Sequence, residues 1–166
     1  MPKKPIALLS VYDKTGIEEF AKSLIELGWE LYASGGTAKA IEDAGLEVKD
    51  VSELIGGTAI LGHRVVTLSR EISAGLLADK DSSNDIEEMQ KLRLPIIDLV
   101  CVDLYPLEEA IAKPDATKKD VITQTDIGGP TMLRSATKGH RIVVSSASQR
   151  QEVIDWLKND RPNESE

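Results

Sequence analysis

The sequence predicts an α/β protein built on a doubly wound parallel sheet of about five strands, which is a Rossmann-type three-layer sandwich. The apolar runs at residues 6–11 and 96–104 are nearly continuous rather than alternating, as is typical of parallel strands covered on both faces. The order strand, helix, strand, helix, strand occupies the first fifty residues. This order predicts parallel strands joined by right-handed crossovers.

Local patterns place the individual elements. Helical spacing of apolar residues predicts a helix at residues 17–27 that ends at Gly28, and Gly45 ends a second helix at residues 37–44. Besides residues 6–11 and 96–104, strands or extended segments are expected at 29–33, 46–48, 63–68 and 141–145. Further helices are expected at 72–78, 85–89, 106–112, 118–123, 131–138 and 149–157.

Length and charge narrow the class of protein. The 166 residues are 41% hydrophobic and 29% charged, which suits one domain whose core needs no disulfide or metal. The formal net charge of −8 disfavours long-range attraction to nucleic acid or an anionic membrane. The apolar run near Met1 is too short for a signal peptide or a membrane span. We expect one cytoplasmic domain over residues 1–166, with a frayed tail at 159–166.

Two turns rich in hydroxyl groups follow the first two predicted strands. One carries Lys14 and Thr15 before a helix, and the other is Ser34-Gly35-Gly36-Thr37. Both turns would lie at the carboxyl edge of a parallel sheet, where helix N-termini favour a phosphate. Arg64 and Thr67 could complete this site. The alternatives are ordinary helix caps, and an Arg64 that pairs with a surface carboxylate.

A second candidate site lies around Asp126-Ile127-Gly128-Gly129-Pro130, where the glycines allow a close approach of the backbone. Asp126 could equally be a helix-capping carboxylate, Lys138 a solvated lysine, and Tyr105 an aromatic lid on the core. Their expected co-location at strand and loop ends of one sheet favours a functional role.

The cysteine and the histidines carry no site of their own. Cys101 lies in an apolar strand, which favours a buried packing residue over a nucleophile. His63 and His140 lack the spacing of zinc ligands, so we expect no metal site.

These motifs resemble, in order along nearly the whole chain, the IMP cyclohydrolase domain of bifunctional AICAR formyltransferase/IMP cyclohydrolase. The resemblance rests on residues 10–16, 34–37, 50–54, 61–62, 64–65, 100, 104–106 and 126–138. It implies a methylglyoxal-synthase-like fold and the closure of formyl-AICAR ribotide to inosine monophosphate (IMP) with loss of water. It also implies no cofactor, and it leaves open a homodimer and a separate formyltransferase partner.

Carried over residue by residue, the resemblance implies that Tyr105, Asp126 and Lys138 are catalytic. It implies that the purine nucleotide substrate is bound by Ser10, Lys14, Thr15, Ser34, Gly35, Gly36, Thr37, Arg64, Thr67, Asp103, Ile127, Gly128 and Gly129. Ring closure needs attack by the carboxamide nitrogen on the formyl carbon, donors for the developing oxyanion and a proton acceptor for the amide. Lys138 and Tyr105 are suitable donors, and Asp126 is a suitable acceptor.

The chain departs from the family pattern at several positions. Val66 stands where the family has a lysine implicated in catalysis, Ser73 where it has a histidine, Tyr12 where it usually has a serine and Asp103 where it usually has asparagine. The formyltransferase domain is absent from the sequence, and Arg70 is a candidate replacement for the missing charge. These departures predict weak activity. The alternative is a non-catalytic nucleotide- or phosphate-binding regulatory module, and methylglyoxal synthase ranks third.

Overall fold

The sheet has five strands in the order β3-β2-β1-β4-β5, and every neighbouring pair is parallel. The computed structural model describes residues 4–62 and 65–159. The strands are β1 (Ile6–Ser10), β2 (Glu30–Ala33), β3 (Lys49–Asp50), β4 (Leu99–Val102) and β5 (Ile142–Val144). Leu8 of β1 pairs with Tyr32 of β2 on one side and with Val100 of β4 on the other. The predicted parallel α/β sheet is therefore confirmed.

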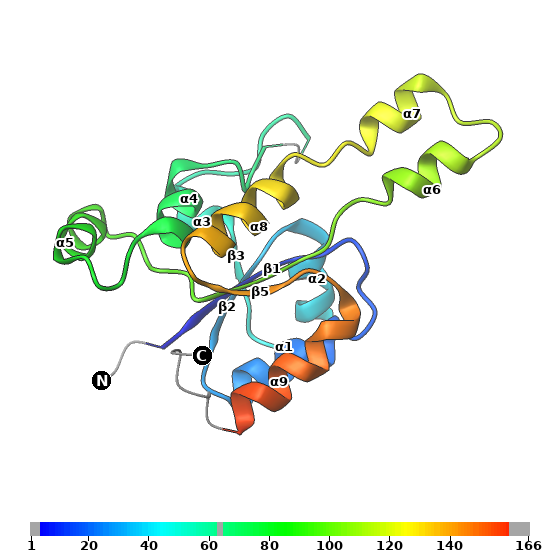
Figure 1. Cartoon of the computed structure of the whole chain (residues 1–166). Coiled ribbons are helices and arrows are strands. Elements are labelled where there is room, and N and C mark those ends of the chain that lie inside the picture. Colours follow the sequence, from blue (N-terminus) through cyan, green and yellow to red (C-terminus); the bar gives the residue numbers. More distant parts are fainter. Residues whose placement is uncertain (1–3, 63–64, 160–166) are drawn as a thin grey trace.

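Helices cover both faces of this sheet (Figure 1). Ala7 and Leu9 of β1 pack with α1 (Ile17–Glu26), α2 (Gly35–Asp43) and α9 (Arg150–Lys158). Ile6 and Leu8 pack with α3 (Ser52–Ile55), α4 (Arg70–Leu77) and α8 (Gly128–Lys138) on the other face. The apolar run of β1 is continuous because successive side chains enter two different cores.

The remaining helices lie outside these two layers. In Figure 1, α6 (Leu107–Ala112) and α7 (Lys118–Thr123) form a pair that extends away from the carboxyl edge of the sheet, and α5 (Ser83–Leu92) lies outside α4. Thr117 and Asp120 form a capping box that starts α7. A 3-10 turn, η1 (Ala147–Gln149), leads into α9.

Several predicted bounds were wrong. The third strand is β3 rather than residues 46–48, because Leu46 and Val48 pack against the core beside the ladder. In the extended segment predicted at 63–68, His63 and Arg64 lie outside the described residues, and Val65 forms only an isolated antiparallel bridge with Ile60. The long fourth strand is reduced to β4, and α8 begins at Gly128 rather than at residue 131.

The carboxyl ends of β1, β2 and β4 meet at one edge of the sheet. Ser10 at the end of β1 lies opposite Val102 of β4, and Leu9 lies opposite Ala33 of β2. The chain winds in opposite directions from β1 to β2 and from β1 to β4, and such a switch point opens a crevice at the carboxyl edge. Among the described residues, no helix is long and apolar enough to cross a membrane.

Candidate functional site

The turns that follow β1 and β2 are tied to each other by side chains. The hydroxyl groups of Ser10 and Ser34 lie 2.7 Å apart and share a hydrogen bond. Thr37 Oγ1 accepts a hydrogen bond from the amide of Val11 at 3.0 Å and donates to the Val11 carbonyl at 3.2 Å. The two predicted phosphate turns therefore form one surface, and the buried hydroxyl of Thr37 holds them together.

An ammonium group lies over the first turn of α2. Ser34 is the extended N-cap, so the amides of Gly35 and Gly36 stand in the first turn, where an α-helix offers no internal acceptor. A Cβ built on Gly36 would lie 3.7 Å from Lys14 Nζ. Lys14 Nζ itself donates to the carbonyls of Val11 at 3.0 Å and Tyr12 at 3.2 Å. A cation and a helix N-terminus at one point form a favourable place for an anion.

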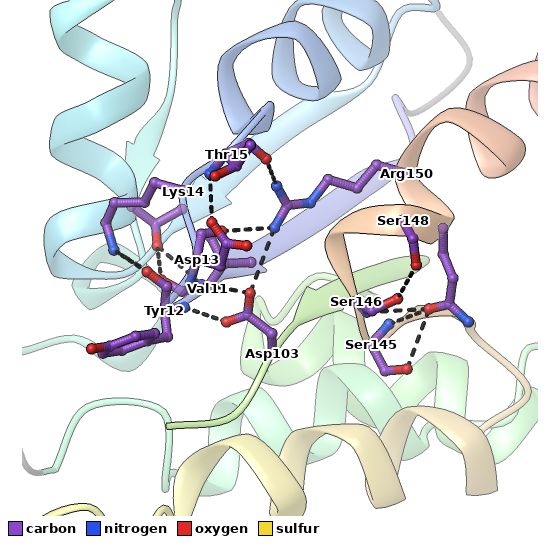
Figure 2. A network of polar contacts seen from close by, with 12 residues as sticks. Val11, Tyr12, Asp13, Lys14, Thr15, Asp103, Ser145, Ser146, Ser148 and Arg150 are labelled. Carbon is purple, nitrogen blue, oxygen red and sulfur yellow. Dashed lines mark hydrogen bonds and ion pairs between the residues drawn. The ribbon is translucent and has the colours of Figure 1, made fainter. Parts of the chain in front are cut away.

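The loop after β1 is held by residues that are distant in the sequence (Figure 2). Asp103, directly after β4, accepts hydrogen bonds from the amides of Tyr12 and, at 3.2 Å, of Asp13. Arg150 of α9 donates to the carbonyls of Thr15 and, at 2.9 Å, of Asp13. Asp103 was predicted to bind substrate, but in the structure its carboxylate is bonded to the backbone of this loop.

The ionisation of two groups follows from these surroundings. The amide of Thr15 donates to Asp13 Oδ1 at 2.9 Å, and this hydrogen bond holds the pKa of Asp13 below its ordinary value, with smaller help from Arg150 and Lys14. Burial raises the pKa of the Cys101 thiol to about 11. Cys101 is therefore the buried packing residue that the sequence predicted, and its side chain is 1% exposed.

A third group of residues meets at the N-terminus of α8. Asp126 Oδ1 accepts a hydrogen bond from the amide of Gly129 at 2.8 Å, so Asp126 does cap this helix. A Cβ on Gly128 would lie 2.6 Å from Thr67 Oγ1, and a Cβ on Gly129 would lie 2.6 Å from Asp126 Oδ2. A Cβ at either position would displace one of these side-chain oxygens, so the two glycines let Thr67 and Asp126 come this close to one helix end.

Aromatic rings join this group to the phosphate turns. The rings of Tyr12 and Tyr105 meet edge to face with their centroids 5.9 Å apart, and the side chain of Tyr105 is half exposed. Leu104, the residue before Tyr105, approaches within 2.7 Å of the Cβ position of Gly129. A continuous path of contacts therefore leads from Ser34 through Tyr12 and Tyr105 to the N-terminus of α8.

A cavity of about 500 Å³ opens beside this path. The loops after β1, β4 and β5 all contribute to its wall, which is lined by Tyr12, Asp13, Lys14, Asp103, Leu104, Pro106, Glu109, Ser145, Ser146 and Ala147. Sequence reasoning missed Arg150 and the serines after β5. Ser145 ends a predicted strand and Ser146 follows it, which could have indicated them, whereas Arg150 has no local signal.

Among the described residues, Lys138 and Arg70 do not join the contacts of this site. Lys138 is the exposed last residue of α8, about 15 Å along the helix axis from Gly128. Arg64 lies outside the described residues. Arg70 is exposed and pairs with Glu71 at 3.3 Å, so it does not supply the charge that is missing at Val66. Val66 is partly buried against the core on the α4 and α8 side of the sheet.

The described residues contain no cluster of three or more His, Cys, Asp or Glu side chains arranged to hold a metal. The described polar groups at this edge include hydroxyls, amides, the Lys14 ammonium and the Arg150 guanidinium. They also include the carboxylates of Asp13, Asp103 and Asp126, which accept hydrogen bonds from backbone amides. Such a set can bind a phosphate and move protons near it.

Comparison with known proteins identifies the family of this fold. The sequence model of the family described as MGS-like domain matches residues 16–131. The chain belongs to the MGS-like domain family. Within it, the chain is 46% identical over 160 residues to the bifunctional purine biosynthesis protein PurH of Staphylococcus haemolyticus (strain JCSC1435) and 49% identical over 160 residues to that of Macrococcus caseolyticus (strain JCSC5402). Both alignments cover 95% of this chain and 32% of the relative.

This MGS-like chain therefore spans about a third of the length of the PurH proteins that it matches. A solved structure described as the crystal structure of ForH superposes with a TM-score of 0.80 at 36% identity, covering 95% of this chain and 81% of that one. The fold predicted from the motifs is confirmed, as is their resemblance to the bifunctional purine enzyme.

Proposed function

We propose that this chain is an IMP cyclohydrolase-like enzyme of purine biosynthesis, which closes the imidazole carboxamide of formyl-AICAR ribotide to IMP. The observation that carries the proposal is the path of contacts from the Lys14 and Ser34 turns through Tyr105 to Asp126. A ribotide needs both ends of this path, one for its 5′-phosphate and one for its reacting groups. The similarity to PurH proteins along 95% of the chain supports the same reaction.

The phosphate is assigned to Lys14, Thr15 and the Gly35 and Gly36 amides. Thr67, which the resemblance also assigns to the phosphate, lies beside Gly128 at the N-terminus of α8. The hydroxyl pair of Ser10 and Ser34 connects these groups at 2.7 Å. Thr37 contributes by holding the loops, because its hydroxyl is already bonded to Val11. The remaining assigned contacts, which include those of Ile127, Gly128 and Arg64, are part of the same proposal.

In the reaction, the carboxamide nitrogen forms a bond to the formyl carbon and gives a carbinolamine. The Tyr105 hydroxyl donates to the oxygen that becomes negatively charged, and Asp126 accepts the proton of the attacking nitrogen. The former formyl oxygen then takes the proton held by Asp126 and leaves as water. The former formamide nitrogen gives its proton to the Tyr105 oxygen as the new ring carbon–nitrogen double bond forms, so both groups return to their starting states. Two acid–base groups are enough for these reaction steps, which neither oxidise nor reduce the substrate.

Lys138 is omitted from these steps because it ends α8 on the amino side of the sheet. The family resemblance implies a catalytic role for Lys138, whereas its place at the far end of α8 predicts little effect on turnover, and the turnover of Lys138→Ala decides between the two. A homodimer, a separate formyltransferase partner and a cytoplasmic location likewise remain parts of the proposal.

One observation favours the second candidate, a non-catalytic nucleotide-binding module. Val66 stands at the position of the family lysine and packs against the apolar core, so an apolar side chain replaces the ammonium at this position. Such a module would use the same phosphate turns but would need neither Tyr105 nor Asp126 for proton transfer.

Two conservative variants separate the candidates. In an enzyme, Tyr105→Phe and Asp126→Asn each lower kcat about 100-fold or more, because a donor or a base is lost while the shape is kept. Tyr32→Phe and Asp85→Asn are matched controls, since the Tyr32 hydroxyl bonds Glu30 and the Asp85 carboxylate caps the Asp79 amide away from the site. Equal turnover in all four variants would contradict the assignment.

A further inference from the structure

Arg150 is a buried cation on the helix that closes the fold. It begins α9, its residue is 4% exposed, and its guanidinium reaches across to the loop after β1 (Figure 2). One terminal nitrogen donates to the Thr15 carbonyl and the other to the Asp13 carbonyl at 2.9 Å. The planar fork of arginine presents donors to two carbonyls in a fixed geometry, whereas a lysine ammonium is a point charge on a flexible stem.

Asp103 binds the same loop through its amides. Its two carboxylate oxygens accept from the amides of Tyr12 and Asp13, and Oδ2 lies 3.6 Å from Arg150 Nη2. Together, Arg150 and Asp103 form hydrogen bonds with the amides of Tyr12 and Asp13 and with the carbonyls of Asp13 and Thr15. The side chain of Asp103 is 15% exposed and that of Arg150 is 5% exposed, so the loop is bound through a pair that is largely shielded from water.

The loop that this pair binds carries the proposed phosphate contacts. The backbone of residues 11–15 sets where Lys14 lies, because Lys14 Nζ bonds to the Val11 and Tyr12 carbonyls and lies over Gly36. Thr37 bonds both polar groups of Val11 from the β2 side. Asp103 acts next to Val11, at the amides of Tyr12 and Asp13. Arg150 acts farther along, at the carbonyls of Asp13 and Thr15, where the chain turns into α1.

We infer that Arg150 and Asp103 are positioning residues that hold the loop at 11–16 in its anion-binding shape and so set the affinity for the 5′-phosphate of the ligand. The inference rests on the proposed function for its ligand, a purine ribonucleoside monophosphate. Neither residue touches the phosphate, and both act through the backbone that carries Lys14 and Thr15. A loop that spends a tenth of its time in the competent shape binds about tenfold more weakly.

Arg150→Met tests this inference, and Arg141→Met is the matched control. Arg141 is also a buried arginine that donates to a backbone carbonyl, that of Ala78, but it precedes β5 at the amino edge of the sheet. Titration with IMP and with inosine separates phosphate recognition from binding of the base and ribose. We expect Arg150→Met to raise the Kd for IMP at least tenfold and to leave the Kd for inosine unchanged.

Kinetics gives a second readout. The KM for formyl-AICAR ribotide should rise with the Kd for IMP, while kcat changes less than twofold, because the phosphate lies far from the bond that forms. Arg150→Lys should recover only part of the affinity, since one ammonium replaces a two-armed donor. This variant also provides the measurement if Arg150→Met does not fold. Arg141→Met should lower the Tm without changing the Kd for IMP.

An unchanged Kd for IMP in a folded Arg150 variant would overturn the inference, as would an equal rise for IMP and inosine. If the unaltered protein does not bind IMP, the proposed function fails, and amide hydrogen exchange at Tyr12 and Asp13 decides the positioning role. Faster exchange in Arg150→Met than in Arg141→Met supports the restraint of the loop, and equal exchange contradicts it.

Discussion

The replacement of Gly129 by alanine tests the close approach on which the Asp126 site depends. The added Cβ would lie 2.6 Å from Asp126 Oδ2 and 2.7 Å from Leu104 Cδ2, whereas ordinary contact begins at 3.4 Å. The carboxylate must therefore shift by about 0.8 Å, and crowding of this kind costs about 2 kcal/mol of folding free energy. A chain of 166 residues should then lose about 4–8 °C in Tm.

The effect on turnover should exceed the effect on stability. A displacement of nearly 1 Å in a group that orients the attacking nitrogen can lower the rate about 100-fold. Gly57→Ala is the matched control, because nothing lies within 4 Å of its Cβ position. Thermal unfolding and formyl-AICAR turnover should be measured on both variants. If Gly129→Ala kept the Tm and turnover of Gly57→Ala, the account of the Asp126 site would be refuted.

Three further predictions concern single residues. Lys138→Ala should retain turnover within about threefold, because a side chain about 15 Å along α8 from Gly128 cannot reach the reacting groups; a loss beyond 100-fold would return Lys138 to the site. Val66→Lys should raise kcat about 100-fold through a restored oxyanion donor and lower the Tm through crowding, whereas an unchanged kcat would favour the binding module. Cys101 should resist iodoacetamide at pH 8 in the native protein, since burial raises its pKa to about 11; rapid alkylation without denaturant would contradict that burial.

The sequence was most informative where one local pattern decides the structure. The apolar run of β1 indicated a central parallel strand because both of its faces are buried. The hydroxyl-rich turns after β1 and β2 could be placed at one edge because parallel strands end together. Leu46 and Val48 misled, because apolar residues beside a ladder have the same composition as a short strand. The four-residue α3 is too short to show a helical period.

The parts of the site that escaped prediction depend on contacts between distant segments. Arg150 meets Asp13 from 137 residues away, and no local pattern indicates the loop that a buried arginine will reach. Asp103 was predicted to bind substrate, yet its bonds to the Tyr12 and Asp13 amides come from the packing of β4 beside β1. Lys138 follows Asp126 at the interval that the family resemblance requires. The intervening residues form an α-helix of 11 residues, however, so Lys138 lies at the far end of α8.

Turnover of formyl-AICAR ribotide by the unaltered protein tests the central claim most directly. The reaction should be followed by the absorbance of IMP, beside a titration of IMP against thermal stability, because a ligand that prefers the native state raises the Tm. The account predicts that IMP raises the Tm and that the substrate closes to IMP in proportion to the enzyme added, at a rate that Asp126→Asn lowers and Asp85→Asn does not. A protein that binds IMP and forms none from formyl-AICAR ribotide would contradict it.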